Sequence, residues 1–424
     1  MKFQRLRGTH DIYGKNALLF ERVESGARQI FRRFGFAELR TPILEARELF
    51  SRALGTETDV VQKEMYEFED RSKLAVAMRP EGTAGIVRAY LENDLDKTQG
   101  LSKFFYLGPM FRSERPQAGR LRQFHQIGVE ELGTDSPYAD AEVLHALLLF
   151  LDALGVKGCT LKINNLGTFE ERKTWYSGGL TLYFKNHYER LCPDCQSRLT
   201  KNILRILDCK VSSCREIVLK SPSILAFLGD ESKNHFSKFK DALNALDVSC
   251  LADAQAMVDP YLVRGLDYYT RTVFEISHPK LGAQDALAAG GRYDHLIESF
   301  GGCPAGAVGF AIGVERLLMC LSDQAEKDEA HKLFFIVTLG EQALTEGFKM
   351  LCGLRNLGLQ VFMDFAAKSL KSQMRAADKV KADFVLILGD DELKKNICTL
   401  KDMKTGEQKE IALEDAVVSL ATEK

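Results

Sequence analysis

An arginine-rich turn between two apolar strands constrains the fold of this chain more than any other segment does. Residues 111–131 read FRSERPQAGRLRQFHQIGVEE, and apolar residues recur on both sides of the turn. This pattern predicts strands at residues 103–112 and 123–133, joined by a turn at Pro116 and Gly119. The segment therefore predicts a body of the α+β class that is built on an antiparallel sheet.

The second predicted strand has one chemically distinctive face. Because strand side chains alternate, Phe124 and His125 point to opposite sides of the sheet. Phe124 shares its face with the amide of Gln126, with Gly128, which allows another group to approach the backbone closely, and with the carboxylate of Glu130. His125 lies on the other face among apolar residues, and we interpret it as a structural histidine.

Four arginines surround the turn: Arg112, Arg115, Arg120 and Arg122. Guanidinium groups suit phosphate because they present a planar fork of donors with a permanent charge. A purine stacked on Phe124 beside arginine-bound phosphates is one natural occupant of this hairpin. The alternative is a solvated hairpin whose arginines pair with nearby carboxylates, as most clustered surface charges do.

The rest of the body mixes helices with short strands. Helices are predicted over residues 19–34 and from residue 140, and strands at residues 74–78, 269–276 and 307–312. Residues 39–44, LRTPIL, are expected to be extended because Pro42 forbids helix. Residues 161 to about 255 are polar and mostly helical in pattern, which indicates an insertion into the body.

A strand–helix alternation after a charged run indicates a second domain. The run SDQAEKDEAHK at residues 322–332 has no apolar face, which is typical of a linker. Beyond it the pattern predicts three strands alternating with two helices, at residues 333–338, 342–356, 359–363, 368–380 and 383–388. We therefore expect a body over residues 1–325 and a small α/β domain with parallel strands over residues 333–424.

The composition argues against a membrane-spanning helix and against a surface that is positively charged overall. No apolar run reaches the roughly 20 residues that a spanning helix needs, and the N-terminus lacks the apolar stretch of a secretory signal. The formal net charge is −2, so any surface that binds nucleic acid must be local. We expect a cytoplasmic protein whose ten cysteines are reduced thiols or metal ligands.

Four cysteines of the predicted insertion form a C-x2-C…C-x4-C pattern: Cys192, Cys195, Cys209 and Cys214. Four thiolates at such spacing would make a tetrahedral, structural zinc site. The C-x2-C pair alone is weaker evidence for a metal. The alternative is four reduced thiols in a small domain.

Three segments in order resemble the class II aminoacyl-tRNA synthetases. Residues 39–44 are similar to the first motif of that family, which builds the dimer interface and so implies a homodimer. Residues 111–130 are similar to the second motif, which binds ATP and the tRNA acceptor end. Residues 309–317, GFAIGVERL, are similar to the third, whose arginine corresponds to Arg316 and holds the γ-phosphate of ATP. Each motif is degenerate, so their order and spacing carry the resemblance.

Two further segments narrow the resemblance to the histidyl-tRNA synthetase family of bacterial type. Residues 262–269, LVRGLDYY, are similar to its first histidine-specific motif, and residues 289–294, AGGRYD, to its second. Chance does not explain both in the right order. The resemblance implies a histidine–tRNA ligase that uses L-histidine, ATP with Mg²⁺ and histidine tRNA. It also implies that residues 333–424 bind the anticodon.

The same resemblance implies roles for individual residues. Arg112 and Arg264 would hold the α-phosphate of ATP from two sides, with Arg264 in place of a metal ion. The other residues implied to contact ATP are Arg120, Arg122, Phe124 and Arg316. Magnesium is implied to bind at the β- and γ-phosphates. In the histidine pocket, the residues implied to hold the α-amino group are Glu81, Thr83 and Gln126. Glu130 and Tyr269 are implied to contact the ring nitrogens, and Tyr268 and Tyr293 to line the pocket. The tRNA acceptor end is implied for Arg115 and Gln117.

The chemistry of histidine activation agrees with such a site. The α-carboxylate that attacks ATP has a pKa of roughly 3.5, so no general base is needed near pH 7. What is needed is in-line placement and neutralisation of the developing negative charge. One assignment has an alternative, because strand alternation puts Tyr268 on an apolar face with Phe274 and Ile276, where it would pack in the core.

Two other interpretations share much of this sequence pattern. The catalytically inactive regulatory subunit of ATP phosphoribosyltransferase has a similar body, but it lacks the C-terminal domain and loses the motif arginines. Here Arg112, Arg264 and Arg316 are all present. A free-standing histidine- or RNA-sensing module would keep the pocket and perform no chemistry. Histidine-dependent ATP–pyrophosphate exchange, followed by charging of tRNA, distinguishes the three.

Overall fold

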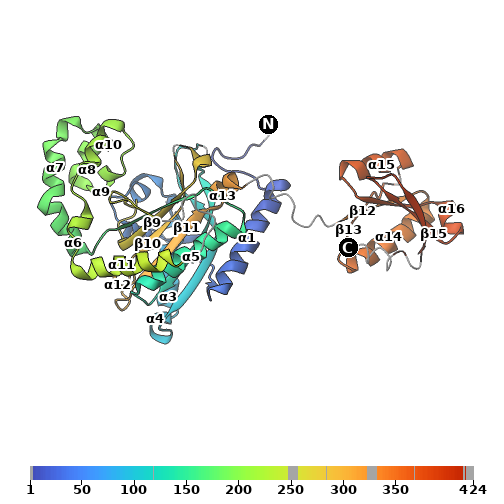
Figure 1. The fold of residues 1–424 in the computed structure, drawn as a ribbon. Helices are drawn as coiled ribbons and strands as arrows, with labels where there is room; N and C mark the ends of the chain where they lie inside the picture. Colours follow the sequence, from blue (N-terminus) through green and yellow to red (C-terminus); the bar gives the residue numbers. More distant parts are fainter. Residues whose placement is uncertain are drawn as a thin grey trace. The chain divides into compact units, whose positions relative to one another are not determined.

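The computed structural model describes residues 3–117, 119–246, 256–282, 284–321, 332–366, 368–413 and residue 416. The chain divides into two compact units, Met1–Ala325 and Glu326–Lys424 (Figure 1). Each unit has hydrophobic cores of its own. Residues 322–331 of the predicted linker and residues 247–255 at the end of the predicted insertion lie outside the described part of the chain.

An eight-stranded sheet forms the centre of the first unit, in the order β1-β5-β6-β11-β10-β9-β7-β8. Neighbours run antiparallel except for the outer pairs β1/β5 and β7/β8, which are parallel. The antiparallel α+β body is thus confirmed, and β5 and β6 are the two predicted hairpin strands. The strands are β1 Ala37–Glu38, β5 Ser102–Phe111, β6 Gln123–Leu132, β7 Thr160–Asn165, β8 Met257–Val258, β9 Thr270–Ser277, β10 Ala286–Arg292 and β11 Ala307–Gly313.

Helices pack on one face of this sheet and bury its apolar side chains. The helices are α1 Lys15–Arg33, α5 Pro137–Ala153, α11 Asp230–Asn244 and α13 Val314–Cys320 (Figure 1). Apolar residues at helical spacing form the buried stripe of α1, including Val23, Ala27 and Phe31. The Phe31 ring lies between those of Phe105 on β5, at 5.7 Å, and Phe150 on α5, at 5.3 Å.

The insertion begins later than residue 161, where the sequence pattern put its start. Residues 160–165 form β7, which pairs antiparallel with β9 and belongs to the main sheet. The alternation in TLKINN is only six residues long and is followed by polar helical sequence, so its strand signal is weak. The last helix of the predicted insertion, α11, returns to the main core through Phe236 and Phe239.

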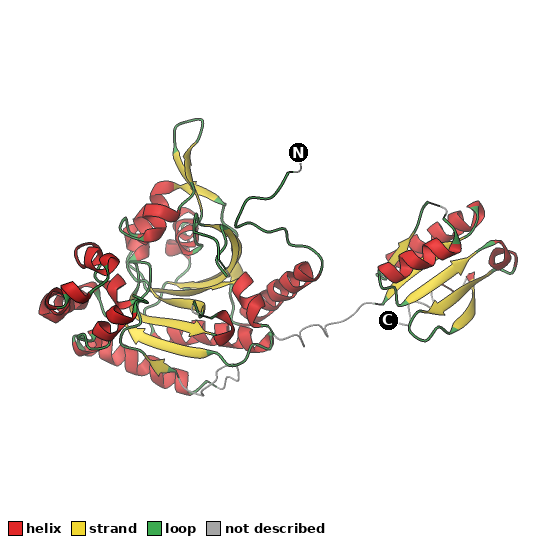
Figure 2. Cartoon of the chain, turned by 90° about the horizontal axis from the view of Figure 1, so that it is seen from above, coloured by secondary structure: helices red, strands yellow, loops and turns green. Residues whose placement is uncertain are grey.

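Short helices make up the insertion proper. They are α6 Phe169–Trp175, α7 Thr181–Asn186, α8 Pro193–Lys201, α9 Leu204–Leu207 and α10 Ser212–Val218, and they cluster together in both views (Figures 1 and 2). Turns of 3₁₀ or π type lie among them, at Tyr176–Leu180, Tyr188–Arg190 and Ile224–Ala226. Trp175 is fully buried among these elements and donates its indole N–H to the Pro222 carbonyl at 2.9 Å.

A three-stranded antiparallel sheet, in the order β2-β4-β3, accompanies the large one. Its elements and the adjoining helices are β2 Leu44–Ala46, β3 Glu67–Glu69, β4 Ala75–Met78, α2 Arg47–Leu54, the π-helix Val60–Glu64, α3 Thr83–Glu92 and α4 Leu95–Thr98. Residues 39–44 connect the two sheets: the Leu39 N–H donates to the Phe105 carbonyl and the Arg79 N–H to the Ile43 carbonyl, both at 2.9 Å.

The second unit is a five-stranded sheet in the order β13-β12-β14-β15-β16, with helices packed against it. Its elements are β12 Leu333–Thr338, α14 Glu341–Asn356, β13 Gln360–Met363, α15 Leu370–Lys379, β14 Phe384–Leu388, α16 Asp390–Lys394, β15 Ile397–Asp402 and β16 Gln408–Ala412. The three predicted strands are parallel, as expected. The antiparallel strands β15 and β16 were not predicted. No helix in the described ranges is long and apolar enough to cross a membrane.

Candidate active site

A cleft of about 360 Å³ lies over the central strands of the large sheet. That volume suits a small-molecule substrate. Twelve of the residues proposed from the sequence line it: Glu81, Thr83, Arg112, Arg120, Phe124, Gln126, Glu130, Arg264, Tyr268, Tyr269, Tyr293 and Arg316. They come from β6 and the turn between β5 and β6, from the starts of α3 and α13, and from the segments before β9 and after β10. The fold thus brings together residues that are more than 200 positions apart.

One end of the cleft is built around a buried carboxyl group. Glu130 accepts a hydrogen bond from the Thr83 hydroxyl at 2.6 Å and another from the Tyr293 hydroxyl. Gly309 on β11 lies opposite Glu130 in the sheet, and a β-carbon there would collide with the carboxylate. Gly128 likewise leaves room for the ring of Tyr106. Glycine at these two positions therefore makes room for the Glu130 carboxyl group and the Tyr106 ring.

Three tyrosines form an aromatic wall beside Glu130. The ring of Tyr268 lies 4.6 Å from that of Tyr269 and 5.5 Å from that of Tyr293, and all three side chains are buried. We call Thr83, Glu130 and these tyrosines the carboxyl pocket. The alternative role for Tyr268 was core packing with Phe274 and Ile276; Tyr268 does belong to a hydrophobic core, but to a different one from these two residues. Arg271 has a φ of 45° and the β9/β10 register shifts nearby, so strict alternation does not extend back to residue 268.

Glu81 lies at the start of α3 and has local partners. Its carboxylate accepts hydrogen bonds from the backbone N–H groups of Thr83, at 2.6 Å, and Ala84, at 2.9 Å. Burial raises the pKa of Glu81, while these backbone hydrogen bonds act to lower it. The residue is therefore both part of the helix start and part of the cleft lining.

The other end of the cleft, the arginine end, contains Arg112, Arg120, Arg264 and Arg316. Arg316 is held by backbone carbonyls, donating to Ala286 at 2.8 Å, to Gly119 at 3.4 Å and to Gln284. Arg112 donates to the Pro80 carbonyl at 2.9 Å, and its guanidinium lies over the Phe124 ring at 5.4 Å. Because carbonyls carry no net charge, they do not compensate the positive charge of Arg316, whereas Arg112 also lies 3.9 Å from the Glu114 carboxylate.

Two carboxylates reduce the positive charge at the arginine end. Glu114 pairs with Arg120 at 3.1 Å, and Glu275 pairs with Arg264 at 2.7 Å. Pairing with carboxylates was the alternative for the hairpin arginines, and it holds for Arg120 and, at the longer distance of 3.9 Å, for Arg112. Two buried polar atoms of the cleft residues have no hydrogen-bond partner in the described protein, Gln126 Oε1 and Arg264 Nε. Since buried polar atoms are nearly always satisfied, these two are candidates for ligand contacts.

Three of the proposed residues lie away from the cleft lining. Arg122 lies against the N-terminal segment: its backbone N–H donates to the Gly8 carbonyl at 2.7 Å, and a β-carbon on Gly8 would meet its side chain at 2.9 Å. Arg115 and Gln117 are exposed and line an adjacent hollow with Lys63 and Glu64. His125 is also outside the cleft. Its Nδ1 contacts Glu315 at 2.8 Å, in agreement with a structural role.

Sequence reasoning missed several residues of the cleft. Glu114, Asp208, Lys210, Glu275, Gln284 and Asp285 all line it. Glu114 and Glu275 lie in segments already singled out, so a search for partners of the arginines would have found them. Asp208 and Lys210 belong to the insertion, about 55 residues before Arg264, and no local pattern connects them with the site.

The buried carboxyl of Glu130 predicts a pH-dependent stability. Burial raises its pKa from 4.5 to about 8, although the hydrogen bonds from Thr83 and Tyr293 act to lower it. A carboxyl with a raised pKa in the fold stabilises it at low pH, and this contribution is lost as pH rises through the folded value. We expect Glu130→Gln to flatten the fall in the free energy of unfolding between about pH 4.5 and 8. Denaturant titrations without substrates measure this slope.

The control for this measurement is Glu69→Gln, an exposed glutamate on β3. Burial also raises the pKa of Glu131, to about 7, so some pH dependence should survive in the Glu130 variant. Equal slopes in Glu130→Gln and the wild type would contradict the raised pKa.

Two family models together match most of the chain. The model described as histidyl-tRNA synthetase matches residues 8–172 and 198–317, which include all twelve residues of the cleft named above. The model described as anticodon binding domain matches residues 332–423, which cover the second unit from β12 onward.

Individual relatives match over nearly the full length. The chain is 44% identical over 415 residues to the histidine–tRNA ligase of Thermodesulfovibrio yellowstonii, covering 98% of this chain and 97% of that protein. It is 45% identical over 415 residues to the histidine–tRNA ligase of Aquifex aeolicus, covering 98% and 100%. The apo structure of S. aureus histidyl-tRNA synthetase matches with a TM-score of 0.82 and 35% identity, covering 99% of this chain and 100% of that one.

Proposed function

Because the chain belongs to the histidyl-tRNA synthetase family and is a histidine–tRNA ligase, we propose that its cleft joins L-histidine to ATP and then passes the histidyl group to the 3′ end of histidine tRNA. ATP is used as its magnesium complex, as the family implies. The observation that carries the proposal is a single cleft in which the carboxyl pocket lies beside the arginine end.

The carboxyl pocket suits an imidazole ring. A neutral imidazole has one donor and one acceptor nitrogen, and Glu130 together with a tyrosine hydroxyl offers matching groups. With a pKa of about 8, Glu130 keeps its proton near pH 7 in the free protein, so it can donate to a ring nitrogen or accept from one. An apolar ring of similar size would leave these buried groups unpaired, which costs binding energy.

The histidine backbone would bind between the two ends of the cleft. Its α-amino group is cationic, and the Gln126 Oε1 atom without a partner and the Glu81 carboxyl are acceptors near the carboxyl pocket. Binding there leaves the α-carboxylate directed towards the arginine end. This orientation places the nucleophile beside the phosphates without any general base.

Activation breaks one bond of ATP and forms one to histidine. An oxygen of the α-carboxylate attacks the α-phosphorus, the bond to the β-phosphate bridge breaks, and pyrophosphate leaves with its magnesium. Negative charge grows on the α-phosphate oxygens, and Arg112 and Arg264 would neutralise it from two sides. Arg120 and Arg316 would bind the β- and γ-phosphates, while the adenine would stack on the Phe124 ring.

Transfer of the histidyl group then needs two parts of the tRNA, its 3′ end and its anticodon. The terminal ribose hydroxyl attacks the carbonyl carbon of the adenylate, and AMP leaves. We assign recognition of the anticodon to residues 333–424, which match an anticodon-binding family model. Exposed basic residues at or near helical spacing on and beside α15 are candidates for phosphate contacts: Lys368, Lys371, Arg375, Lys379 and Lys381.

We further infer that the enzyme is a cytoplasmic homodimer. Large apolar side chains are exposed on and next to the three-stranded sheet, where the resemblance puts the dimer interface: Ile43, Leu44, Phe68 and Leu74. Exposed apolar surface of this kind commonly marks an interface. Light scattering on the purified protein measures the mass directly, and a monomer at micromolar concentration would contradict this assignment.

The experiment that tests the whole proposal is histidine-dependent ATP–pyrophosphate exchange, followed by charging of histidine tRNA. The proposed enzyme performs both. A regulatory paralogue would perform neither, and a histidine sensor would bind histidine without exchange. Folded protein that fails both reactions would overturn the proposal.

The hollow beside the cleft predicts a variant that separates the two reactions. Arg115 and Gln117 lie outside the cleft lining and are exposed, which supports a contact with RNA rather than with ATP. We expect Gln117→Ala and Arg115→Ala to impair charging of tRNA while pyrophosphate exchange stays nearly intact. Arg120→Ala, at the arginine end, is the matched comparison and should lower both rates. If exchange and charging fall in parallel in Gln117→Ala, the turn serves ATP instead.

A further inference from the structure

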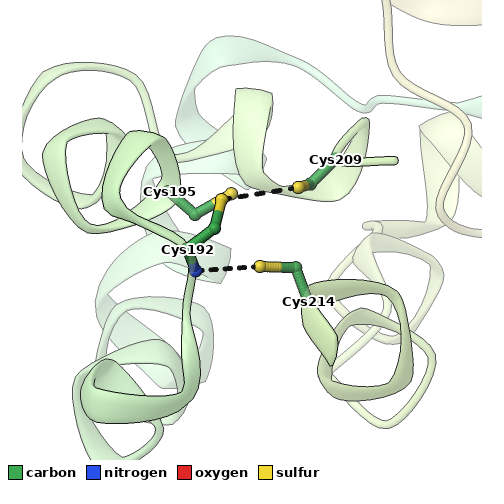
Figure 3. Close-up of side chains that lie close together, drawn as sticks. All are labelled: Cys192, Cys195, Cys209 and Cys214. Carbon is green, nitrogen blue, oxygen red and sulfur yellow. Dashed lines mark hydrogen bonds between the residues drawn. The ribbon is translucent and has the colours of Figure 1, made fainter. Parts of the chain in front are cut away.

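Four cysteine sulfurs converge inside the insertion (Figure 3). Cys192, Cys195, Cys209 and Cys214 have their Sγ atoms all within 4.8 Å of one another, and three of the four side chains are buried. They come from different elements: Cys192 precedes α8, Cys195 lies in its first turn, Cys209 follows α9 and Cys214 belongs to α10. Residues up to 22 positions apart thus direct thiols to one point.

The spacing of these sulfurs fits a single tetrahedral ion. Zinc–thiolate bonds of about 2.3 Å in a tetrahedron separate the sulfurs by about 3.8 Å. The Cys192 and Cys209 sulfurs are 3.8 Å apart. A disulfide would instead bring two sulfurs to about 2.05 Å, and these four cysteines are free thiols. The alternative of four reduced thiols does not explain why all four converge.

The surroundings of the cluster also suit thiolates. The backbone N–H of Cys192 donates to the Cys214 sulfur at 3.1 Å, an interaction that stabilises negative charge on sulfur (Figure 3). The three helices that carry the cysteines have nine, four and seven residues. Helices this short are marginal by themselves, and an ion that ties them together would contribute directly to their stability.

The cluster is connected to the cleft through α9 and the residues around it. Asp208 and Lys210, on either side of Cys209, line the cleft. Just before α9, Asn202 donates to the Asp267 carboxylate at 3.0 Å, and within it Arg205 donates to the Gly265 carbonyl at 3.4 Å. Both acceptors lie in the segment 262–269, which carries Arg264. A shift of α9 would therefore move the segment that presents Arg264 to ATP.

From this geometry we propose that Cys192, Cys195, Cys209 and Cys214 bind one zinc ion, which holds α9 and residues 208–210 against the segment of Arg264. Zinc is favoured because four thiolates in a tetrahedron provide soft ligands and leave no open position for chemistry. The ion is therefore structural, and its effect on the reaction is one of positioning. The histidyl-tRNA synthetase family model does not match residues 173–197, where the first two of these cysteines lie.

Metal analysis of the untagged, full-length protein tests the site without any activity measurement. After dialysis against metal-free buffer we expect one zinc ion per chain by inductively coupled plasma mass spectrometry. The double variant Cys195→Ser/Cys209→Ser should lose it, whereas Cys352→Ser, an exposed cysteine on α14, should keep it. Zinc well below one per chain in the wild type, iron in its place, or equal zinc in the double variant would overturn the site.

Cobalt substitution keeps the test decisive if the double variant does not fold. Wild-type protein stripped of zinc and loaded with Co²⁺ should display thiolate-to-cobalt charge-transfer bands and the ligand-field bands of a tetrahedral ion. Bands of an octahedral ion, typical of oxygen ligands, would overturn the four-thiolate assignment. Because no step of this test uses histidine, ATP or tRNA, its failure is distinct from a failure of the proposed ligase function.

The positioning role rests on the proposed function and has its own readout. In zinc-free protein that remains folded by circular dichroism, we expect kcat for pyrophosphate exchange to fall at least tenfold while KM for histidine changes less than threefold. The reason is that the contacts from the insertion reach Gly265 and Asp267, beside Arg264. Thr83, Glu130 and Tyr293, which are joined by hydrogen bonds in the carboxyl pocket, lie outside the segment 262–269. Added zinc should restore kcat. Unchanged kcat in the zinc-free protein would overturn the positioning role, whatever the zinc content.

Discussion

Replacement of Arg264 by alanine is expected to slow histidyl-adenylate formation by about 10²-fold or more, or about 3 kcal/mol of transition-state stabilisation. The guanidinium lies in the cleft with a buried Nε that has no hydrogen-bond partner in the described protein. It would act on charge that develops only as the pentavalent phosphorus forms. Single-turnover formation of adenylate should fall, while the Kd for histidine should change little, since Arg264 is not part of the carboxyl pocket.

Two further variants separate this role from a structural one. Arg28→Ala removes a guanidinium that pairs with Glu38 at 3.2 Å on the surface of α1, far from the cleft lining, and should leave the rate unchanged. Glu275→Gln removes the carboxylate that pairs with Arg264 but keeps its shape. It should have a much smaller effect than Arg264→Ala if the arginine is needed for ATP rather than for Glu275. Near-normal single-turnover activation by Arg264→Ala would remove this residue from the mechanism.

The strands around the arginine-rich turn could be predicted because their signal is local. Alternating side chains on β6 fix which face each residue takes, and one face needs Gly128 and Glu130 while the other buries Ile127 and Val129. A one-residue slip would exchange the two faces and put the Glu130 carboxyl into the apolar core that now contains Ile127 and Val129, so the sequence tolerates a single register. The same argument explains why His125 could be separated from the site by its position alone.

Alternation was misleading where the backbone departs from regular geometry. The left-handed conformation of Arg271 and the shift in β9/β10 register lie between Tyr268 and the regular part of β9, and both adjacent tyrosines line the same cleft. Arginine rarely adopts a positive φ, so its presence does not predict one, and no sequence pattern predicts this irregularity of the strand. The position of Arg122 outside the cleft could not be predicted for a related reason. Its side chain lies against Gly8, which is more than 110 residues earlier in the sequence.

The features hardest to predict are those that need three-dimensional proximity between distant segments. The ion pair between Arg264 and Glu275 brackets a turn, and the contact between Asn202 and Asp267 spans 65 residues. Neither leaves a periodic trace in the sequence. The four cysteines are an intermediate case: their spacing suggested a metal, but only the convergence of the sulfurs distinguishes a site from four separate thiols.

Removal of the C-terminal unit is expected to leave activation intact and to weaken charging strongly. A chain ending near residue 325 keeps both cores of the first unit and every residue that lines the cleft. It should therefore fold and perform histidine-dependent pyrophosphate exchange at a near-normal rate. Charging should fall through a higher KM for tRNA, because about three to five phosphate contacts by the lost basic residues make a large electrostatic contribution to binding.

Substitutions in the anticodon distinguish specific recognition of the tRNA by the second unit from nonspecific binding to its phosphates. In the full-length enzyme, substitutions in the anticodon should lower charging, because base contacts add specificity to the phosphate contacts. In the truncated enzyme the same substitutions should have no effect. Lys371→Glu in the full-length chain should weaken charging and its dependence on salt. Lys349→Glu on α14, where Lys349 pairs with Glu346, serves as the charge-matched control. Equal sensitivity of both enzymes to the anticodon would mean that residues 333–424 support the fold or the dimer and do not read the tRNA.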